Sequence, residues 1–395
     1  MEHQTLIPKK RIDSIDALRG FAIIGIVLWH CMEHFDLSYP LVSPPPVSTD
    51  TTVFTTIQFL FAGKAYAIFS LLFGLSFFMQ MDSQASKGVD FRVRFVWRLF
   101  LLFVLGYING CFYMGEFFIV YAVLGVLLVL FYNVPSRWLL ILAIILFLQI
   151  PGFVIFFSQL RDNVPVSSEA YMDALYHESS IVFTEGSFWD VIRYNMVKGQ
   201  MTKCLWVINN YRYMQLIGLF IIGLLIGRAG IHKDEAKMVK YSKRLLPYSV
   251  AVMAIFYPIA WWIIPATGLD GAALDTGVTL FRNFAALGHM MLYICLFMLA
   301  YYQWNAKKVL DRLSPVGKMS VTNYMAQSWL GVFLFYGFGL YLTPYWGPTW
   351  SACVGLCIAL LQILYSNWWI KRFYYGPVEW LWRVCTWMRP VKFRR

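Results

Sequence analysis

The first apolar stretch of the chain carries titratable side chains at both of its ends. Asp16 and Arg19 stand at its start, and His30, Glu33 and His34 stand at its end. A neutral imidazole can accept a proton from a hydroxyl or an amine near neutral pH, or can itself carry an acyl group. His30 is therefore the residue of this stretch best suited to acyl transfer, with Glu33 and His34 as neighbours that can assist it. A histidine that merely meets water at a helix end is the alternative.

The elements that must position these residues are membrane helices. The chain has 395 residues, of which 59% are hydrophobic and only 14% are charged. Soluble domains have about 25% charged residues. The net charge of +12 comes from Lys and Arg in short blocks between apolar runs, which is typical of the loops of a membrane protein. We therefore expect a lipid bilayer, and no nucleic acid, as the partner.

Ten apolar runs are long enough to cross a bilayer, which takes about 20 residues. We predict an all-α polytopic membrane protein that forms a single transmembrane domain over residues 1–395. The predicted spans are residues 16–35, 54–80, 96–113, 115–132, 138–158, 212–228, 246–264, 279–303, 319–342 and 350–370.

The positions of Lys and Arg predict that both termini are cytoplasmic. A basic block, Lys9–Arg11, precedes the first span, and the loops at 36–53, 265–278 and 343–349 contain no Lys or Arg. Because cytoplasmic loops are enriched in these residues, the three neutral loops are predicted to be external. The segment 159–211 is then one long extracytoplasmic segment. Within it, Ser187 and Asp190 have the spacing of a capping box.

Several polar residues from other spans fall in the same outer half of the membrane as His30. They are Lys64, Glu116, Arg212, Arg282 and His289. Charges within a bilayer are costly and usually functional, so their convergence would make a substrate pocket in which Lys64 or Arg282 stabilises an oxyanion. The alternative is that Lys64 and Arg282 extend outward to the interface. His30 and His34 share a helix face, but no third ligand is evident, so we expect no metal.

Three motifs resemble the YeiB-type bacterial membrane family, whose function is unknown. They are Asp16-Ala-Leu-Arg19-Gly20, VGKMSVTNYMAQS at residues 316–328 and YGPVEWLWR at residues 375–383. The three motifs span the whole chain, and the YeiB-like C-terminal part comprises about residues 212–395. The first motif also resembles the opening of transmembrane acyltransferases, which include the family-3 acyltransferases and heparan-α-glucosaminide N-acetyltransferase. Arg19 and His30 match the Arg-x10-His spacing of the family-3 enzymes.

This resemblance implies a multi-pass protein of the bacterial inner membrane. It implies that acyl-CoA, in the first place acetyl-CoA, is the cytoplasmic donor, that a glycan or similar envelope molecule is the acceptor, and that His30 is essential. Asp16 and Arg19, at the inner end, are candidates for serving the donor. In the second motif, Asn323, Tyr324, Gln327 and Ser328 are candidates for lining the route by which CoA enters, and interhelical hydrogen bonding is an equally good interpretation.

The main hypothesis is thus a membrane acyltransferase. A small-solute transporter or channel is the first alternative, since polar residues in several spans can line a permeation path. Few Gly or Pro residues interrupt the spans, which argues against a transporter. A non-enzymatic membrane assembly protein is the second alternative, and the sequence leaves a homo-oligomer open.

Overall fold

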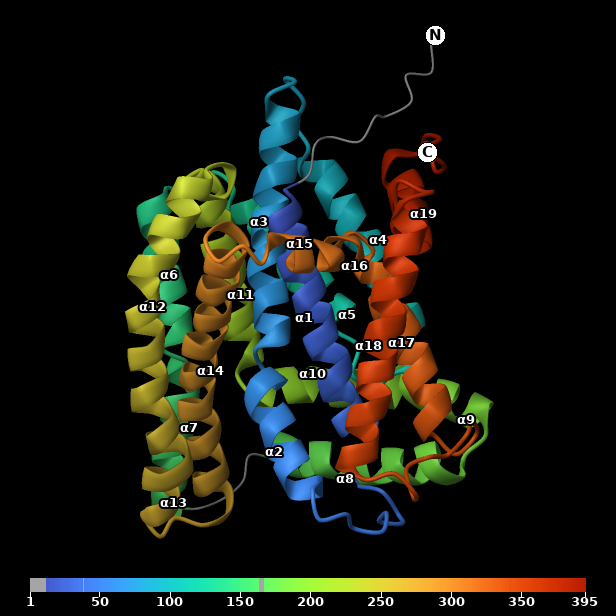
Figure 1. The fold of residues 1–395 in the computed structure, drawn as a ribbon. Coiled ribbons are helices and arrows are strands. Elements are labelled where there is room, and N and C mark those ends of the chain that lie inside the picture. Colours follow the sequence, from blue (N-terminus) through green and yellow to red (C-terminus); the bar gives the residue numbers. More distant parts are fainter. Residues whose placement is uncertain (1–11, 38, 163–166) are drawn as a thin grey trace.

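The structure is a computed structural model that describes residues 12–37, 39–162 and 167–395 (Figure 1). The described part of the chain is helical throughout, apart from its loops and one isolated bridge between Phe373 and Arg394. The basic block Lys9–Arg11 lies outside the described residues. The predicted all-α fold is confirmed for the described ranges.

Seven helical segments of the described chain are long and apolar enough to cross a membrane. They are α1 (Asp13–Met32), α2 with α3 (Asp50–Phe61 and Ala65–Ala85), α4 (Arg92–Phe112), α6 with α7 (Ser136–Phe147 and Ile150–Asp162), α12 through α13 (Glu235–Pro258 and Ile264–Ala266), α14 (Gly271–Tyr302) and α18 (Pro348–Ile370). An eighth is gained if the bent pair Phe188–Asn209 and Arg212–Arg228 (the latter is α11) counts as one span. A multi-pass membrane protein is therefore confirmed.

The other two predicted spans coincide with shorter helices, α5 (Phe118–Phe131) and α17 (Ser320–Phe335). Each of the ten predicted spans overlaps a helix, but length and composition support seven or eight crossings rather than ten. The orientation in the membrane stays a prediction.

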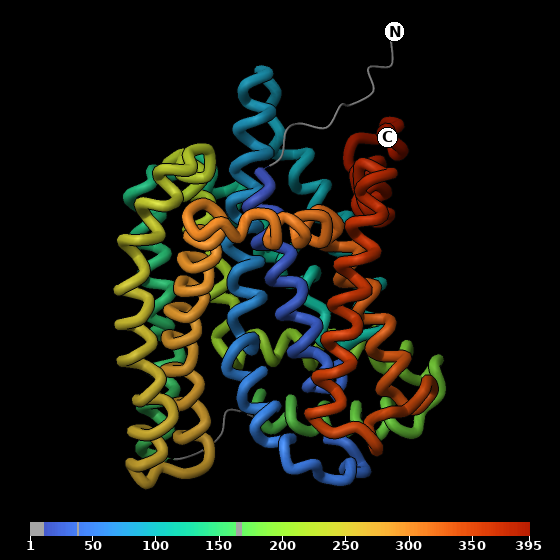
Figure 2. The backbone as a smooth tube through the Cα atoms, viewed as in Figure 1, coloured from blue at the N-terminus to red at the C-terminus, as the bar shows by residue number. Residues whose placement is uncertain are grey.

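The helices form two groups that lie side by side (Figures 1 and 2). In the views shown, α6, α7, α12 and α14 stand on the left, and α1, α3, α4, α17 and α18 form the larger group. The C-terminus and α19 (Pro377–Trp387) lie at the upper end. The opposite end is crossed by α8 (Ser167–Glu185), α9 (Phe188–Tyr194) and α10 (Gln200–Asn209). The predicted external segment thus forms a helical layer across one end.

The capping box at Ser187 is confirmed. The Ser187 side chain accepts a hydrogen bond from the Asp190 backbone N–H, and the Asp190 carboxylate accepts one from the Ser187 backbone N–H. Together they satisfy two backbone donors at the start of α9 that have no partner within the helix.

The first two sequence motifs meet by direct backbone packing. Gly20 of α1 lies against the Leu313 carbonyl, and Gly317 of α16 (Ser314–Lys318) lies against the Asp16 carbonyl. Neither position has room for a Cβ atom, so only glycine lets the two helices approach this closely.

The third motif joins the second at the start of α17. Glu379 of α19 accepts hydrogen bonds from the backbone N–H groups of Val321 (2.7 Å) and Thr322 (3.0 Å). A carboxylate placed at these unpaired donors stabilises the helix N-terminus. All three motifs therefore build one end of the bundle, away from His30.

Two helix breaks face one another near the middle of the molecule. Between α2 and α3 the chain turns at Gly63, whose φ of +81° favours glycine. Between α10 and α11 it turns at Tyr211, with φ +56°. From these breaks α3 and α11 run side by side, with Gly74 against the Phe220 backbone and Gly223 against the Leu71 backbone. The N-termini of α3 and α11 consequently lie next to each other.

Candidate functional site

A cavity of about 450 Å³ lies between the two helix breaks, the end of α1 and the layer formed by α8 and α10. It is lined by aromatic rings and by many titratable groups. The titratable lining residues are His30, Glu33, Asp36, Tyr39, Lys64, Tyr66, Tyr113, Tyr121, Asp173, Tyr176, Lys203, Arg212, Tyr257, Arg282 and Tyr324. A concave site with converging polar groups of this kind is the default candidate for binding and catalysis.

His30 lies in the last turn of α1 and lines the cavity. Its Nδ1 is 2.9 Å from the hydroxyl of Tyr113 and 3.5 Å from Oε2 of Glu33. The imidazole is thus held by one neutral and one acidic partner, an arrangement that orients a general base.

The turn that follows α1 is strained. His34, Phe35 and Asp36 all have positive φ, from +46° to +69°, and each such residue other than glycine costs about 1–2 kcal/mol. Burial of the Phe35 ring and the hydrogen bond from the Tyr336 hydroxyl to the Phe35 carbonyl (2.7 Å) hold the turn in place. Strain kept in this way clusters at functional sites, and here it directs Asp36 into the cavity.

Asp36 lies beside Tyr113, and both residues line the cavity. A Cβ atom at residue 115 would overlap both the Oδ2 atom of Asp36 and the Tyr113 hydroxyl. Gly115 is therefore required by the site itself. Burial raises the pKa of the Asp36 carboxyl above its ordinary value, although the Tyr113 hydroxyl and Lys203 beside it act in the opposite direction.

Lys203 of α10 brings a positive charge to the acidic part of the cavity. Its ammonium lies 4.1 Å from the centre of the Phe117 ring and 4.7 Å from that of Trp206, and its acidic neighbours are Asp36, Glu33 and Glu116. The sequence did not identify this residue, because it belongs to the segment predicted to be external. Its spacing of three from Trp206 on an amphipathic helix was the available signal.

Glu116 lies next to the cavity without lining it. Its carboxylate accepts hydrogen bonds from the Phe118 backbone N–H (2.5 Å) and from the Asn109 side chain. The Asn109 amide is also 3.5 Å from the Ser328 hydroxyl. Glu116 therefore fixes the Phe117–Phe118 turn that forms part of the wall.

Lys64, Arg212 and Arg282 form a second, purely cationic part of the cavity. Lys64 and Arg212 are both buried, and the charged neighbours of Lys64 are Arg282 and Arg212. No carboxylate in the described ranges forms an ion pair with any of the three.

Two of the predicted histidines lie outside the cavity. His34 stacks on Phe335, with ring centres 4.5 Å apart, and its Nε2 is 2.9 Å from the Ser351 hydroxyl. His289 lies behind Tyr257, whose hydroxyl is 3.0 Å from its Nδ1. His34 points away from His30 because the turn after α1 is left-handed, which helical spacing did not anticipate.

Asp16 and Arg19 are also separated from the cavity. Arg19 bonds to Asp16 (2.8 Å) and to the Ser76 hydroxyl (3.0 Å), beneath α16. The cavity lining on α1 begins at Ile26, seven residues or about 10 Å along the axis from Arg19.

The polar residues of the second motif mostly bond to neighbouring helices. The Asn323 amide donates to the Val316 carbonyl (3.1 Å) and the Ser366 hydroxyl (2.9 Å), and Gln327 lies 3.4 Å from Gln362. Ser328 donates to the Tyr324 carbonyl (2.9 Å). Among the four predicted CoA-route residues, Tyr324 lines the cavity. The geometry of the other three favours the alternative of interhelical hydrogen bonding.

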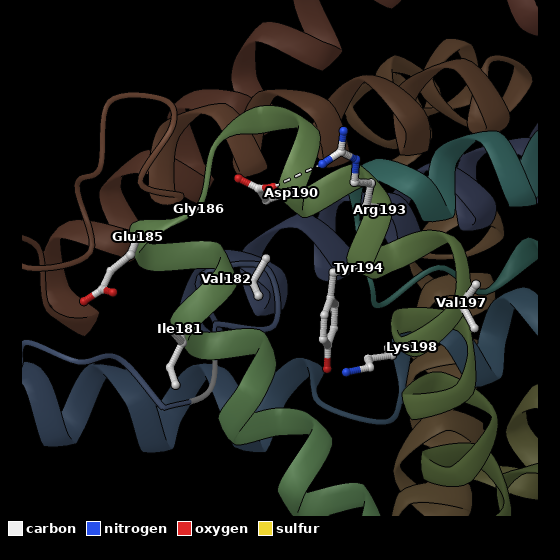
Figure 3. A pocket seen from close by; sticks show the side chains of 9 residues that line it. All are labelled: Ile181, Val182, Glu185, Gly186, Asp190, Arg193, Tyr194, Val197 and Lys198. Atoms are coloured by element: carbon white, nitrogen blue, oxygen red, sulfur yellow. Dashed lines mark ion pairs between the residues drawn. The ribbon is translucent and has the colours of Figure 1, made fainter.

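Another hollow lies on the outer surface of the helical layer, between α8 and α9 (Figure 3). Three of its charged side chains are exposed and already paired: Arg193 lies 3.8 Å from Asp190, and Lys198 pairs with Glu178. Its one buried titratable side chain, Tyr194, already donates to the Leu175 carbonyl (2.6 Å), so the cavity around His30 is the better candidate site.

Two family models match this chain. The model described as heparan-alpha-glucosaminide N-acetyltransferase, catalytic, matches residues 11–163. The model described as a protein of unknown function (DUF418) matches residues 226–389. The first range contains His30, Glu33, Asp36, Lys64 and Tyr113.

Three uncharacterized relatives match nearly the whole chain. YxaH of Bacillus subtilis is 26% identical over 98% of this chain and 96% of its own length. YeiB of Escherichia coli is 26% identical over 94% of this chain and 95% of its own length. An uncharacterized 39.9 kDa protein from Bacillus acidopullulyticus is 24% identical over 96% and 95%.

No solved structure matches the chain. The full-length relatives and the two family models confirm the resemblance found in the motifs: the chain is similar to the YeiB-like DUF418 family and, over its first part, to the acyltransferase-like superfamily of heparan-alpha-glucosaminide N-acetyltransferase.

Proposed function

We propose that the protein is a membrane acyltransferase whose base is His30. The observation that carries this proposal is the imidazole of His30, bonded to Tyr113 and close to Glu33 within a polar cavity. The proposal is supported by the match of residues 11–163 to an N-acetyltransferase catalytic model. We propose acetyl-CoA of the bacterial cytoplasm as donor, a hydroxyl or amine of an envelope molecule such as a glycan as acceptor, and the inner membrane as the location.

In the proposed reaction, a ring nitrogen of His30 takes the proton from the acceptor hydroxyl or amine. The freed acceptor atom attacks the carbonyl carbon of the thioester. The carbon–sulfur bond then breaks, and the CoA thiolate leaves with the proton that the imidazolium returns. Acceptor and acyl group are joined, free CoA is released, and no further reactant is needed.

The neighbours of His30 serve this step in different ways. The Tyr113 hydroxyl orients the ring, and the Glu33 carboxylate, 3.5 Å from Nδ1, stabilises the imidazolium as it forms. Lys203 offsets the charge of the nearby carboxylates. A positive side chain of the cavity, such as Lys64 or Arg282, stabilises the oxyanion of the tetrahedral intermediate.

A cytoplasmic donor has to pass the closely packed part of the helix bundle that separates Arg19 from the cavity, whose lining on α1 begins at Ile26. In the structure that part includes the contact of Gly20 with Gly317 and its neighbours. We propose that the donor reaches His30 when α16 moves away from α1, with Asp16 and Arg19 meeting the donor on the way.

A small-solute transporter is the second candidate, and one observation favours it. The chain breaks α2 from α3 and α10 from α11 at the cavity, and transporters bind substrates at broken helices of this kind. This weakens the sequence-based argument against a transporter.

The test uses purified protein in proteoliposomes with acetyl-CoA and bacterial envelope extract. We expect release of the free CoA thiol that depends on the extract, is lost in His30→Ala and is retained in His34→Gln, which keeps a polar group near Ser351. The proposal is wrong if the wild type and His30→Ala release thiol at the same rate. Solute flux without thiol release would support the transporter instead.

A further inference from the structure

The cationic part of the cavity has a composition that demands an anion. Lys64 and Arg212 are only 5% and 6% exposed, and Arg282 is half-buried. Three positive charges held together in this way repel one another, and each is costly to bury without a partner. An arrangement that persists at this cost is most simply explained by a negative ligand.

Among the residues that the structure describes, none supplies that negative charge through an ion pair with Lys64, Arg212 or Arg282. Of the carboxylates that line the same cavity, Asp36 and Glu33 are charged neighbours of Lys203. The charged neighbours of Lys64 are Arg282 and Arg212, and Arg212 in turn is the charged neighbour of Arg282.

The hydrogen-bonding capacity of these side chains is also incompletely used. Arg212 donates from Nη1 to Gln215 (2.9 Å), but its buried Nε has no partner within the described residues. Lys64 donates one bond, to the Gln58 carbonyl (3.2 Å). Both side chains line the cavity, so their unused N–H groups are available to a ligand there.

Two helix N-termini add to the positive potential. Lys64 directly precedes α3, which has 21 residues, and Arg212 is the first residue of α11, which has 17. The two helices pack side by side, and the Arg212 Nη2 atom is 4.0 Å from the place that a Cβ atom would take at Gly63. Each helix N-terminus is equivalent to about half a positive charge and presents free backbone N–H groups.

We infer that Lys64, Arg212 and Arg282, together with the N-termini of α3 and α11, bind a phosphate or diphosphate group of a substrate. Three cations and two helix N-termini exceed what a single carboxylate neutralises, whereas a phosphate ester carries about −1.5 to −2. Arginine also matches phosphate oxygens with two parallel hydrogen bonds. The inference deepens the proposed function and rests on it, because the bound group belongs to a substrate only if the protein is an acyltransferase.

Two sources can supply this group. One is the diphosphate of the CoA donor, and the other is a phosphate on the envelope acceptor, such as a phosphorylated polymer or lipid. Both would place the reacting atoms between the cationic part of the cavity and His30, because both parts line one continuous space.

The test measures binding of inorganic pyrophosphate to the purified full chain in detergent, by titration calorimetry at low salt. We expect Lys64→Gln and Arg282→Gln each to weaken binding by about tenfold or more, since each removes a charge-assisted hydrogen bond. Arg282→Lys should bind nearly as well as the wild type. The matched control is Arg161→Gln, because the Arg161 side chain is 83% exposed, pairs with Asp162 and is not part of the cavity lining.

Competition identifies the source. Displacement of pyrophosphate by CoA but not by pantetheine, which lacks phosphate, assigns the site to the donor. Displacement by glycerol 3-phosphate but not by CoA assigns it to the acceptor.

The inference is overturned if the wild type does not bind pyrophosphate, or if Lys64→Gln and Arg282→Gln both bind it as the wild type does. Arg282→Gln keeps the test open should Lys64→Gln fail to fold, because no described residue bonds to Arg282. His30→Ala should bind pyrophosphate normally. A protein that binds pyrophosphate but transfers no acyl group would therefore contradict the proposed function alone.

Discussion

The Tyr113 hydroxyl lies 2.9 Å from Nδ1 of His30, although 83 positions separate the two residues in the chain. Their rings meet edge to face, with centres 5.2 Å apart. Tyr113 itself is fully buried, at the turn between α4 and α5. The His30 imidazole on α1 is thus oriented from a different helix pair.

Substituting Tyr113 by Phe removes this hydroxyl and keeps the ring. We expect CoA release to slow by about tenfold or more, a barrier increase of about 1.4 kcal/mol, because the imidazole is no longer oriented. The measurement is the rate constant in proteoliposomes at saturating acetyl-CoA. Tyr345→Phe is the control, since Tyr345 is 68% exposed. Equal rates for the two variants would remove Tyr113 from the mechanism.

Substituting Gly115 by Ala should damage the site more than the fold. The new methyl group overlaps Asp36 Oδ2 and the Tyr113 hydroxyl, so both must move away from their places beside His30. We expect thiol release to fall at least as far as in Tyr113→Phe. Gly355→Ala is the matched control, because the atom nearest to its added methyl group is the end of the flexible Leu28 side chain, 3.1 Å away. Normal activity in Gly115→Ala would show that the site tolerates this displacement.

Asp36 should make stability depend on pH in a predictable direction. Burial raises the pKa of this carboxyl in the folded protein above its ordinary value of 3.8, so the folded state holds a proton that the unfolded state releases. The stabilisation is complete below pH 3.8 and is lost as pH rises toward the raised pKa. We therefore expect Asp36→Asn to gain in melting temperature over the wild type as pH rises, and then to level off.

Melting curves in detergent between pH 4 and 8 measure this difference. A difference between Asp36→Asn and wild type that stays constant over the whole range would contradict the assignment of a raised pKa to Asp36.

Gly20 should be important for stability rather than for chemistry. An added methyl group meets the Leu313 carbonyl of the backbone, which cannot rotate away, and overpacking of this kind costs about 1–3 kcal/mol. We expect Gly20→Ala to melt at a lower temperature than the wild type. In Gly25→Ala the nearest atoms belong to the Phe61 ring, which can turn, so that variant should lose less. The reverse order would refute the backbone-contact account.

Much of the fold could be predicted from the sequence, because every helix that crosses a bilayer needs about 20 mostly apolar residues. All ten predicted spans overlap helices. Counting the crossings was harder, since α5 and α17 are short for a bilayer and α11 joins its neighbour at a bend of 74°. Apolar composition does not encode where a helix bends.

The candidate site could be predicted only in part. Charged or titratable side chains are costly to place within a bilayer, so they stand out in an apolar stretch of sequence. This signal identified His30, Glu33, Lys64, Arg212 and Arg282. Their convergence depends on the three-dimensional structure. Lys203, Asp36 and Tyr113 were missed because an external lysine, a loop aspartate and one tyrosine among 24 carry no such signal. The left-handed turn at residues 34–36 also has no glycine to reveal it.

The central claim is that His30 transfers acyl groups, and a radiolabel measures this most directly. Membranes containing the wild type, His30→Ala or His34→Gln are incubated with acetyl-CoA labelled in the acetyl group, and label is counted in envelope material after free CoA is removed. The account predicts labelled envelope material with the wild type and His34→Gln and background counts with His30→Ala. Equal labelling by the wild type and a folded His30→Ala protein would contradict it.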